Sequence, residues 1–228
     1  MAGMDKNIWI IANWKSNKTI AEALEWVSFV GPKIERREHV KIVVCPSFID
    51  IEEVKKAIVV GNFPLMVGSQ DLSPYDVGAY TGEEAGRILK DVIELSILGH
   101  SERRENFGES NIMVAEKVAQ ALLNNIIPLV CIQNVDTPIP KGVKLVAYEP
   151  IFAIGTGTPD TPENAQEIAR KLKEKYGSPA GGLEILYGGS VTSENVNHYL
   201  NEDDIDGVLV GALSLDQEEF LKIVEVVR

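Results

Sequence analysis

The stretch LSILGHSERRENFGESNIMVAEKVAQALLNNIIPLVCI, residues 95–132, contains two short apolar runs separated by a long amphipathic segment. The runs Leu95–Gly99 and Pro128–Ile132 are aliphatic without strict polar alternation, which predicts strands buried on both faces. Between them, Glu109–Asn125 predicts a helix with one apolar stripe. The stripe consists of Ile112, Val114, Ala115, Val118, Ala119, Leu122 and Leu123. The stretch therefore predicts two buried strands joined by a covering helix.

The same alternation extends along the rest of the chain. A second helix is predicted over Thr161–Tyr176, which opens with a capping threonine and a proline and ends before Gly177. Eight strands with intervening helices favour an α/β fold of the closed (β/α)₈ barrel type, although an eighth strand could equally extend an open sheet. The further predicted strands are Ile8–Asn13, Lys41–Cys45, Leu65–Ser69, Lys144–Tyr148, Glu184–Tyr187 and Gly207–Val210.

The connection between the fifth and sixth predicted strands is unusually short. It consists of Gln133–Gly142 and contains Pro138 and Pro140, which leaves no room for a normal covering helix. We therefore expect this helix to be missing or reduced to a turn. The outer faces of the two neighbouring strands are then expected to lie uncovered.

Composition bounds the class of protein. The 228 residues lack a linker-like segment, so we expect residues 1–228 to form a single barrel domain. A net charge of −12 argues against a nucleic-acid partner, and a small anionic ligand would need local positive potential. Cys45 and Cys131 lie in apolar runs, which suggests neither a disulfide framework nor a zinc site. With no apolar stretch long enough for a membrane span, we expect a cytoplasmic protein.

Polar residues follow several predicted strands, at the end where barrel enzymes hold their active sites. Each has a plain structural alternative when taken alone: a solvated charge for Lys15, a turn or cap for His100, and a loop carboxylate for Glu149. The charged residues of 102–109 similarly suggest a solvated cluster. The set comprises Asn13 and Lys15, His100 and Glu102, Glu149, Gly188-Gly189-Ser190, and Gly211-Ala212.

Together, these segments resemble the motifs of the triosephosphate isomerase family, in the family's order. The resemblance implies interconversion of dihydroxyacetone phosphate and glyceraldehyde 3-phosphate, a step of glycolysis and gluconeogenesis, without metal or organic cofactor. The motifs are Ala12-Asn13-Trp14-Lys15; Gly99-His100-Ser101-Glu102-Arg103-Arg104 with Phe107-Gly108-Glu109; Ala147-Tyr148-Glu149-Pro150 with Ala153-Ile154-Gly155-Thr156-Gly157; and Tyr187-Gly188-Gly189-Ser190-Val191.

The resemblance also implies residue roles. Glu149 would be the base, neutral His100 and Asn13 would donate to the substrate oxygen, Lys15 would supply positive charge, and Glu102 would support Lys15. Backbone N–H groups of Gly155, Ser190, Gly211 and Ala212 would hold the phosphate. The lid would comprise Pro150, Ile151, Phe152, Ala153, Ile154, Gly155, Thr156 and Gly157. The segment Gln70–Glu83 resembles the loop that reaches into a partner's active site, which implies a homodimer or homotetramer.

Three departures from the family pattern matter. Ala212 replaces a second glycine and would be strained if the backbone there needed a positive φ. Phe152 stands where tryptophan is common. Archaeal members of the family are similarly shortened and form tetramers, so we expect an assembly larger than a dimer, with the uncovered strand faces at its extra interface. Two other functions stay open: another phosphate-binding barrel enzyme, such as a sugar-phosphate epimerase or a biosynthetic isomerase, and a barrel kept as a non-catalytic scaffold.

Overall fold

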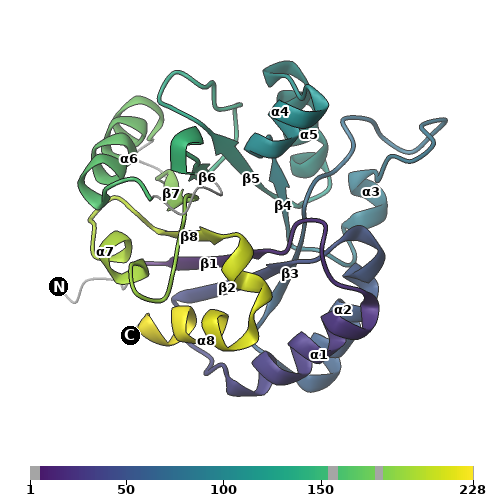
Figure 1. Ribbon diagram of the computed structural model, residues 1–228. Coiled ribbons are helices and arrows are strands. Elements are labelled where there is room, and N and C mark those ends of the chain that lie inside the picture. The colour runs from purple at the N-terminus through teal and green to yellow at the C-terminus, as the bar shows by residue number, and fades with distance from the viewer. Residues whose placement is uncertain (1–5, 154–158, 178–181, 228) are drawn as a thin grey trace.

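The computed structural model describes residues 6–153, 159–177 and 182–227. These residues form eight parallel strands that close into a barrel in sequence order, with β1 paired to β8 (Figure 1). Closure excludes the open sheet that strand counting had allowed. The strands are β1 (Ile8–Asn13), β2 (Val40–Cys45), β3 (Met66–Ser69), β4 (Leu95–Leu98), β5 (Ile127–Ile132), β6 (Leu145–Tyr148), β7 (Glu184–Tyr187) and β8 (Gly207–Val210).

Helices surround the barrel, and side-chain caps fix where several of them begin. The Oγ of Ser110 accepts from the N–H of Met113, so the helix predicted from Glu109 begins two residues later. Thr19 and Glu22 form a capping box at the first helix. The α-helices are α1 (Ile20–Val30), α2 (Ile51–Gly61), α3 (Gly86–Leu89), α4 (Ser101–Phe107), α5 (Asn111–Leu123), α6 (Pro162–Tyr176), α7 (Val196–Leu200) and α8 (Gln217–Val226). Short 3₁₀ helices are η1 (Gly31–Lys33), η2 (Phe48–Asp50), η3 (Ile151–Ala153) and η4 (Ala212–Leu215).

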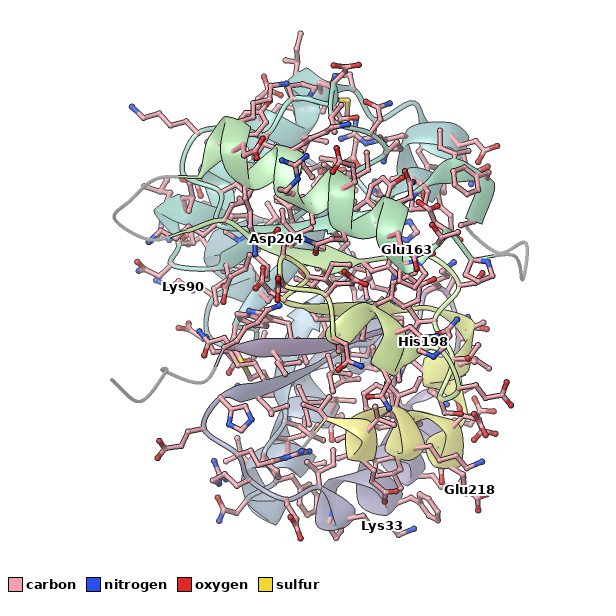
Figure 2. The ribbon with its side chains drawn as sticks, turned by 90° about the vertical axis from the view of Figure 1, so that its left-hand side faces the viewer. Lys33, Lys90, Glu163, His198, Asp204 and Glu218 are labelled. Atoms are coloured by element: carbon pink, nitrogen blue, oxygen red, sulfur yellow. The ribbon has the colours of Figure 1, made fainter. Side chains whose placement is uncertain are left out.

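The apolar core has two layers because each strand is buried on both faces. Side chains such as Ile11, Leu129 and Leu209 fill the barrel, while a larger cluster packs between the strands and the helices. Charged side chains such as Lys33 and Glu218 extend from the helices into solvent (Figure 2). No helix within the described ranges has the length and apolarity needed to cross a membrane.

The connection between β5 and β6 has no helix, as the sequence predicted. The expectation that the neighbouring strands are uncovered was wrong, since every residue of β6 is buried and β5 is buried from Pro128 onward. Val135, Ile139 and Val143 of the connection itself pack against the outer apolar cluster. Apolar side chains of an irregular segment thus contribute to the outer layer where the helix is missing.

Candidate active site

A pocket of about 290 Å³ opens at the carboxyl ends of the strands. It brings together predicted residues that are far apart in the sequence, because the ends of parallel strands meet at one rim of the barrel. Those lining it are Asn13, Lys15, His100, Glu149, Gly188, Gly189, Ser190, Gly211 and Ala212.

Glu149 follows β6 and lies almost wholly within the protein, with 1% of its surface exposed. Its N–H donates to the carbonyl of Ile132 at 2.7 Å, which fixes the backbone from which the side chain departs. One carboxylate oxygen accepts from the N–H of Ser101 at 2.9 Å, and the other lies 3.2 Å from Nε2 of His100. A side chain at Gly188 would begin 2.9 Å from Cγ of Glu149, so glycine there leaves room for the carboxylate.

His100 is both a helix cap and a pocket residue. Its Nδ1 accepts from the N–H of Glu102 at the start of α4, at 3.2 Å. A nitrogen that accepts carries no proton, so this hydrogen bond assigns the neutral tautomer with hydrogen on Nε2. That N–H points at Glu149. The cap and the functional interpretation are therefore compatible, because each uses a different ring nitrogen.

Lys15 has a left-handed backbone, with φ of 54°. Its N–H donates to Oδ1 of Asn13 at 3.0 Å, and its carbonyl accepts from Nε2 of Gln70 at 2.7 Å. The Lys15 ammonium forms an ion pair with Glu102. These contacts hold in place a conformation that a lysine rarely adopts. The sequence placed Gln70 only in a partner-contacting loop, since nothing local marks it as a support for Lys15.

The turns after β7 and β8 form another wall of the pocket. The Ser190 hydroxyl donates to the carbonyl of Ala153 at 2.8 Å, and any side chain at Gly189 would overlap the hydroxyl of Tyr187. Gly211 precedes η4, which begins at Ala212. Ala212 is not among the non-glycine residues with positive φ, so the strain considered for this substitution does not arise.

The predicted lid is described in part. Ile151 and Phe152 lie in η3 with exposed side chains, and Ala153 is buried. The N–H of Ala153 donates to the carbonyl of Pro150 at 2.8 Å. The predicted lid residues Ile154, Gly155, Thr156 and Gly157, including the predicted phosphate contact at Gly155, lie outside the described residues.

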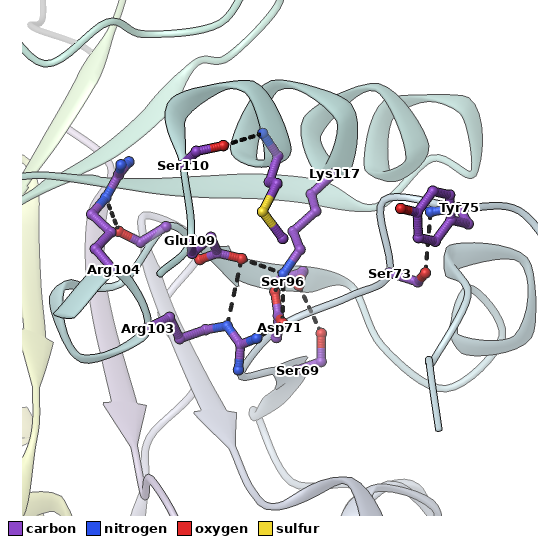
Figure 3. Close-up of polar contacts among 12 residues, drawn as sticks. Ser69, Asp71, Ser73, Tyr75, Ser96, Arg103, Arg104, Glu109, Ser110 and Lys117 are labelled. Atoms are coloured by element: carbon purple, nitrogen blue, oxygen red, sulfur yellow. Dashed lines mark hydrogen bonds and ion pairs between the residues drawn. The ribbon is translucent and has the colours of Figure 1, made fainter. Parts of the chain in front are cut away.

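The plain interpretation of residues 102–109 was a solvated cluster of charges. The structure shows instead that some of these charged residues, which follow β4, join a buried network. Lys117 of α5, only 2% exposed, ion-pairs with Glu109 and lies 2.7 Å from both oxygens of Asp71 (Figure 3). Arg103 lies 2.8 Å from Asp71 and 3.5 Å from Glu109. Burial raises the pKa of Asp71, and Lys117 opposes that rise. The network ties the segment after β3 to α5.

A buried carboxylate, an imidazole N–H and an ammonium thus converge at the rim where barrel enzymes bind substrates. Among the residues that the structure describes, no group of His, Cys, Asp and Glu could hold a metal ion. The fold and the site define a (β/α)₈-barrel protein with an acid–base site.

Comparison with known proteins narrows this class. The sequence matches the family described as triosephosphate isomerase over residues 8–227. Relatives named triosephosphate isomerase include those of Alkaliphilus oremlandii, 39% identical over 94% of this chain and 97% of the relative, and Moorella thermoacetica, 38% identical over 94% and 96%. A third, from Mesomycoplasma hyorhinis, is 36% identical over 96% and 98%. The chain belongs to the triosephosphate isomerase family.

Proposed function

We propose that the protein interconverts dihydroxyacetone phosphate and D-glyceraldehyde 3-phosphate by proton transfer through an enediolate. The observation that carries the residue assignment is the direct contact, at 3.2 Å, between a carboxylate oxygen of Glu149 and Nε2 of neutral His100 inside the pocket. Family membership supports the reaction. The same membership favours it over a sugar-phosphate epimerase or a non-catalytic barrel.

Glu149 is the base that removes a proton from the carbon next to the carbonyl. The substrate oxygen competes with Glu149 for the Nε2 hydrogen of His100, so binding frees the carboxylate to turn toward the carbon. His100 and the amide of Asn13 then donate to the oxygen as negative charge develops on it. Proton transfer and stabilisation of the negative charge on the oxygen both take place in this pocket, and the proposal requires no metal or organic cofactor.

The phosphate binds between Lys15 and the turns after β7 and β8. The ammonium of Lys15 and the N–H groups of Ser190, Gly211 and Ala212 supply positive potential that a chain of net charge −12 otherwise lacks. Glu102 holds the ammonium by its ion pair. The proposal also assigns the lid to residues 150–157 and a further phosphate contact to the N–H of Gly155, although residues 154–157 lie outside the described residues.

A coupled assay with glyceraldehyde 3-phosphate tests the assignment. Glu149→Gln keeps the side-chain shape but removes the base, so kcat should fall by at least about 10²-fold. Glu184→Gln is the matched control because Glu184 begins β7, at the opposite end of the barrel, and should leave kcat unchanged. Full activity in Glu149→Gln would refute the mechanism, whereas an inactive wild type would refute the function.

The proposal includes self-association through the segment Gln70–Glu83, whose exposed part, residues 75–83, protrudes from the barrel between β3 and α3 (Figure 1). Tyr75 and Tyr80 stack with ring centroids 4.2 Å apart, yet each stays 46% exposed. Apolar surface on a protruding loop is typical of an interface between subunits. Light scattering should give a dimer or tetramer for the wild type, and Tyr75→Lys should shift it toward monomer.

We also propose that the protein is cytoplasmic and that its chain forms a single barrel domain.

A further inference from the structure

Asp160 is a buried acidic residue that the sequence did not mark as functional. It precedes α6 and is 7% exposed. One carboxylate oxygen accepts from the hydroxyl of Tyr148 at 3.1 Å and from Nδ2 of Asn164 at 2.7 Å. The other accepts from the N–H of Thr161 at 2.8 Å. Donors on both oxygens fix the orientation of the carboxylate.

The backbone of Asp160 is fixed by contacts that do not involve its carboxylate. Its N–H donates to the hydroxyl of Tyr187 at 2.8 Å, and its carbonyl accepts from the hydroxyl of Tyr199. The rings of Tyr187 and Tyr199 stack with centroids 3.9 Å apart. A substitution that changes only the carboxylate therefore leaves these supports in place.

Tyr148 connects this carboxylate to the active site. It is the last residue of β6 and directly precedes Glu149. Its ring belongs to the apolar layer outside the barrel, whereas Ala147 belongs to the layer inside. Its carbonyl accepts from the N–H of Gly188 at 2.8 Å. Burial and the Asp160 carboxylate raise the pKa of Tyr148, so the phenol stays protonated and donates throughout the working pH range.

We propose that Asp160 is a positioning residue for the isomerase reaction, whose carboxylate acts through the hydroxyl of Tyr148 to set the direction in which Glu149 enters the pocket. Asp160 itself does not line the pocket. Backbone hydrogen bonds hold the end of β6 within the sheet. The hydrogen bond from the Tyr148 hydroxyl to the Asp160 carboxylate holds it from outside the barrel. This inference rests on the proposed role of Glu149 as the base.

A plainer role for Asp160 is to support the start of α6 through Thr161 and Asn164. That role predicts a loss of thermal stability without a change in turnover. The positioning role predicts a loss of turnover that depends on the Tyr148 hydroxyl, so the two can be separated by kinetics.

The test is a double-mutant cycle of Asp160→Asn and Tyr148→Phe, assayed with glyceraldehyde 3-phosphate at a temperature where circular dichroism finds every variant folded. Each single variant should lower kcat about 10-fold, because small displacements of a reacting group are costly. The double variant should be no slower than either single variant, since both remove the same interaction. KM and the inhibition constant of inorganic phosphate should stay within about twofold of wild type, as expected when only the base is displaced.

The matched control is Asp204→Asn. The Asp204 carboxylate also accepts from a side-chain amide, Nε2 of Gln166 at 2.7 Å, and it lies 3.6 Å from the ammonium of Lys173. Both partners belong to α6, so kcat should not change. Unchanged kcat in Asp160→Asn, or losses that multiply in the double variant, would overturn the positioning role. If the wild type is active and Glu149→Gln is not, such a result refutes this inference alone. An inactive wild type or an active Glu149→Gln refutes the proposed function instead.

Discussion

Replacing Lys117 with methionine tests how far the buried charge network supports the fold. In the wild type, the Lys117 ammonium and the Arg103 guanidinium face the carboxylates of Asp71 and Glu109. The variant leaves both carboxylates with Arg103, which is one-third exposed. Removing one partner of a buried ion pair costs about 3–5 kcal/mol, and the remaining guanidinium favours the lower end, about 3 kcal/mol.

The assay is urea unfolding at fixed protein concentration, followed by circular dichroism. A loss of about 3 kcal/mol is a large share of the 5–15 kcal/mol typical of a domain, so the midpoint should fall clearly at an unchanged slope. Lys56→Met is the matched control, because Lys56 pairs with Glu52 and Glu53 on the surface and should leave the midpoint unchanged. A Lys117→Met midpoint equal to that of Lys56→Met would refute the reasoning.

The same variant has an expected pH dependence. Burial raises the pKa of Asp71 and Lys117 lowers it, so without Lys117 the folded-state pKa rises further. A carboxyl whose pKa is higher in the folded than in the unfolded state destabilises the fold once it must ionise. The stability deficit of Lys117→Met should therefore be largest near neutral pH and shrink as the pH falls through the raised pKa. A deficit that grows toward acid would show that Asp71 is not the group responsible.

Three further predictions concern the pocket and the two buried cysteines. Gly188→Ala would place a carbon 2.9 Å from Cγ of Glu149 and should lower kcat by about 10-fold or more. Gly182→Ala, whose added carbon has no atom of the described residues within 4 Å, should not change kcat. Lys15→Met should weaken competitive inhibition by inorganic phosphate at least about 10-fold, and an unchanged inhibition constant would remove Lys15 from the phosphate site. Burial raises the pKa of Cys45 and Cys131, so neither thiol should react with a thiol reagent at pH 8 until urea unfolds the chain.

The rim of the site could be predicted from the sequence because barrel topology brings strand ends together whatever lies between them. Lys15, His100 and Glu149 were ambiguous singly, since each also fits a solvated charge, a cap or a loop. Their common position after strands, within motifs of one family, gave them weight. In the structure these residues line one pocket.

The buried charges could not be predicted in the same way. Asp71 and Lys117 are 46 residues apart, and Asp160 meets tyrosines from β6, β7 and α7. From local composition alone, each of them would be predicted to lie at the surface, since an unpaired charge is rarely buried. Only the fold supplies the partners that make burial tolerable, so a reading of neighbours along the chain misses them.

The short connection after β5 changes where a larger assembly would form. The expectation of a tetramer located its extra interface on strands that lacked a helix, but β6 and most of β5 are buried, and Val135, Ile139 and Val143 pack against the outer apolar cluster. Exposed apolar side chains occur instead on α4 and α5, where Phe107, Ile112 and Leu123 are each more than two-thirds exposed. If the protein associates beyond a dimer, this helical surface offers more apolar area to bury than the strands do. Substituting Ile112 with lysine, and not residues of the connection, is therefore the change that should limit assembly to a dimer.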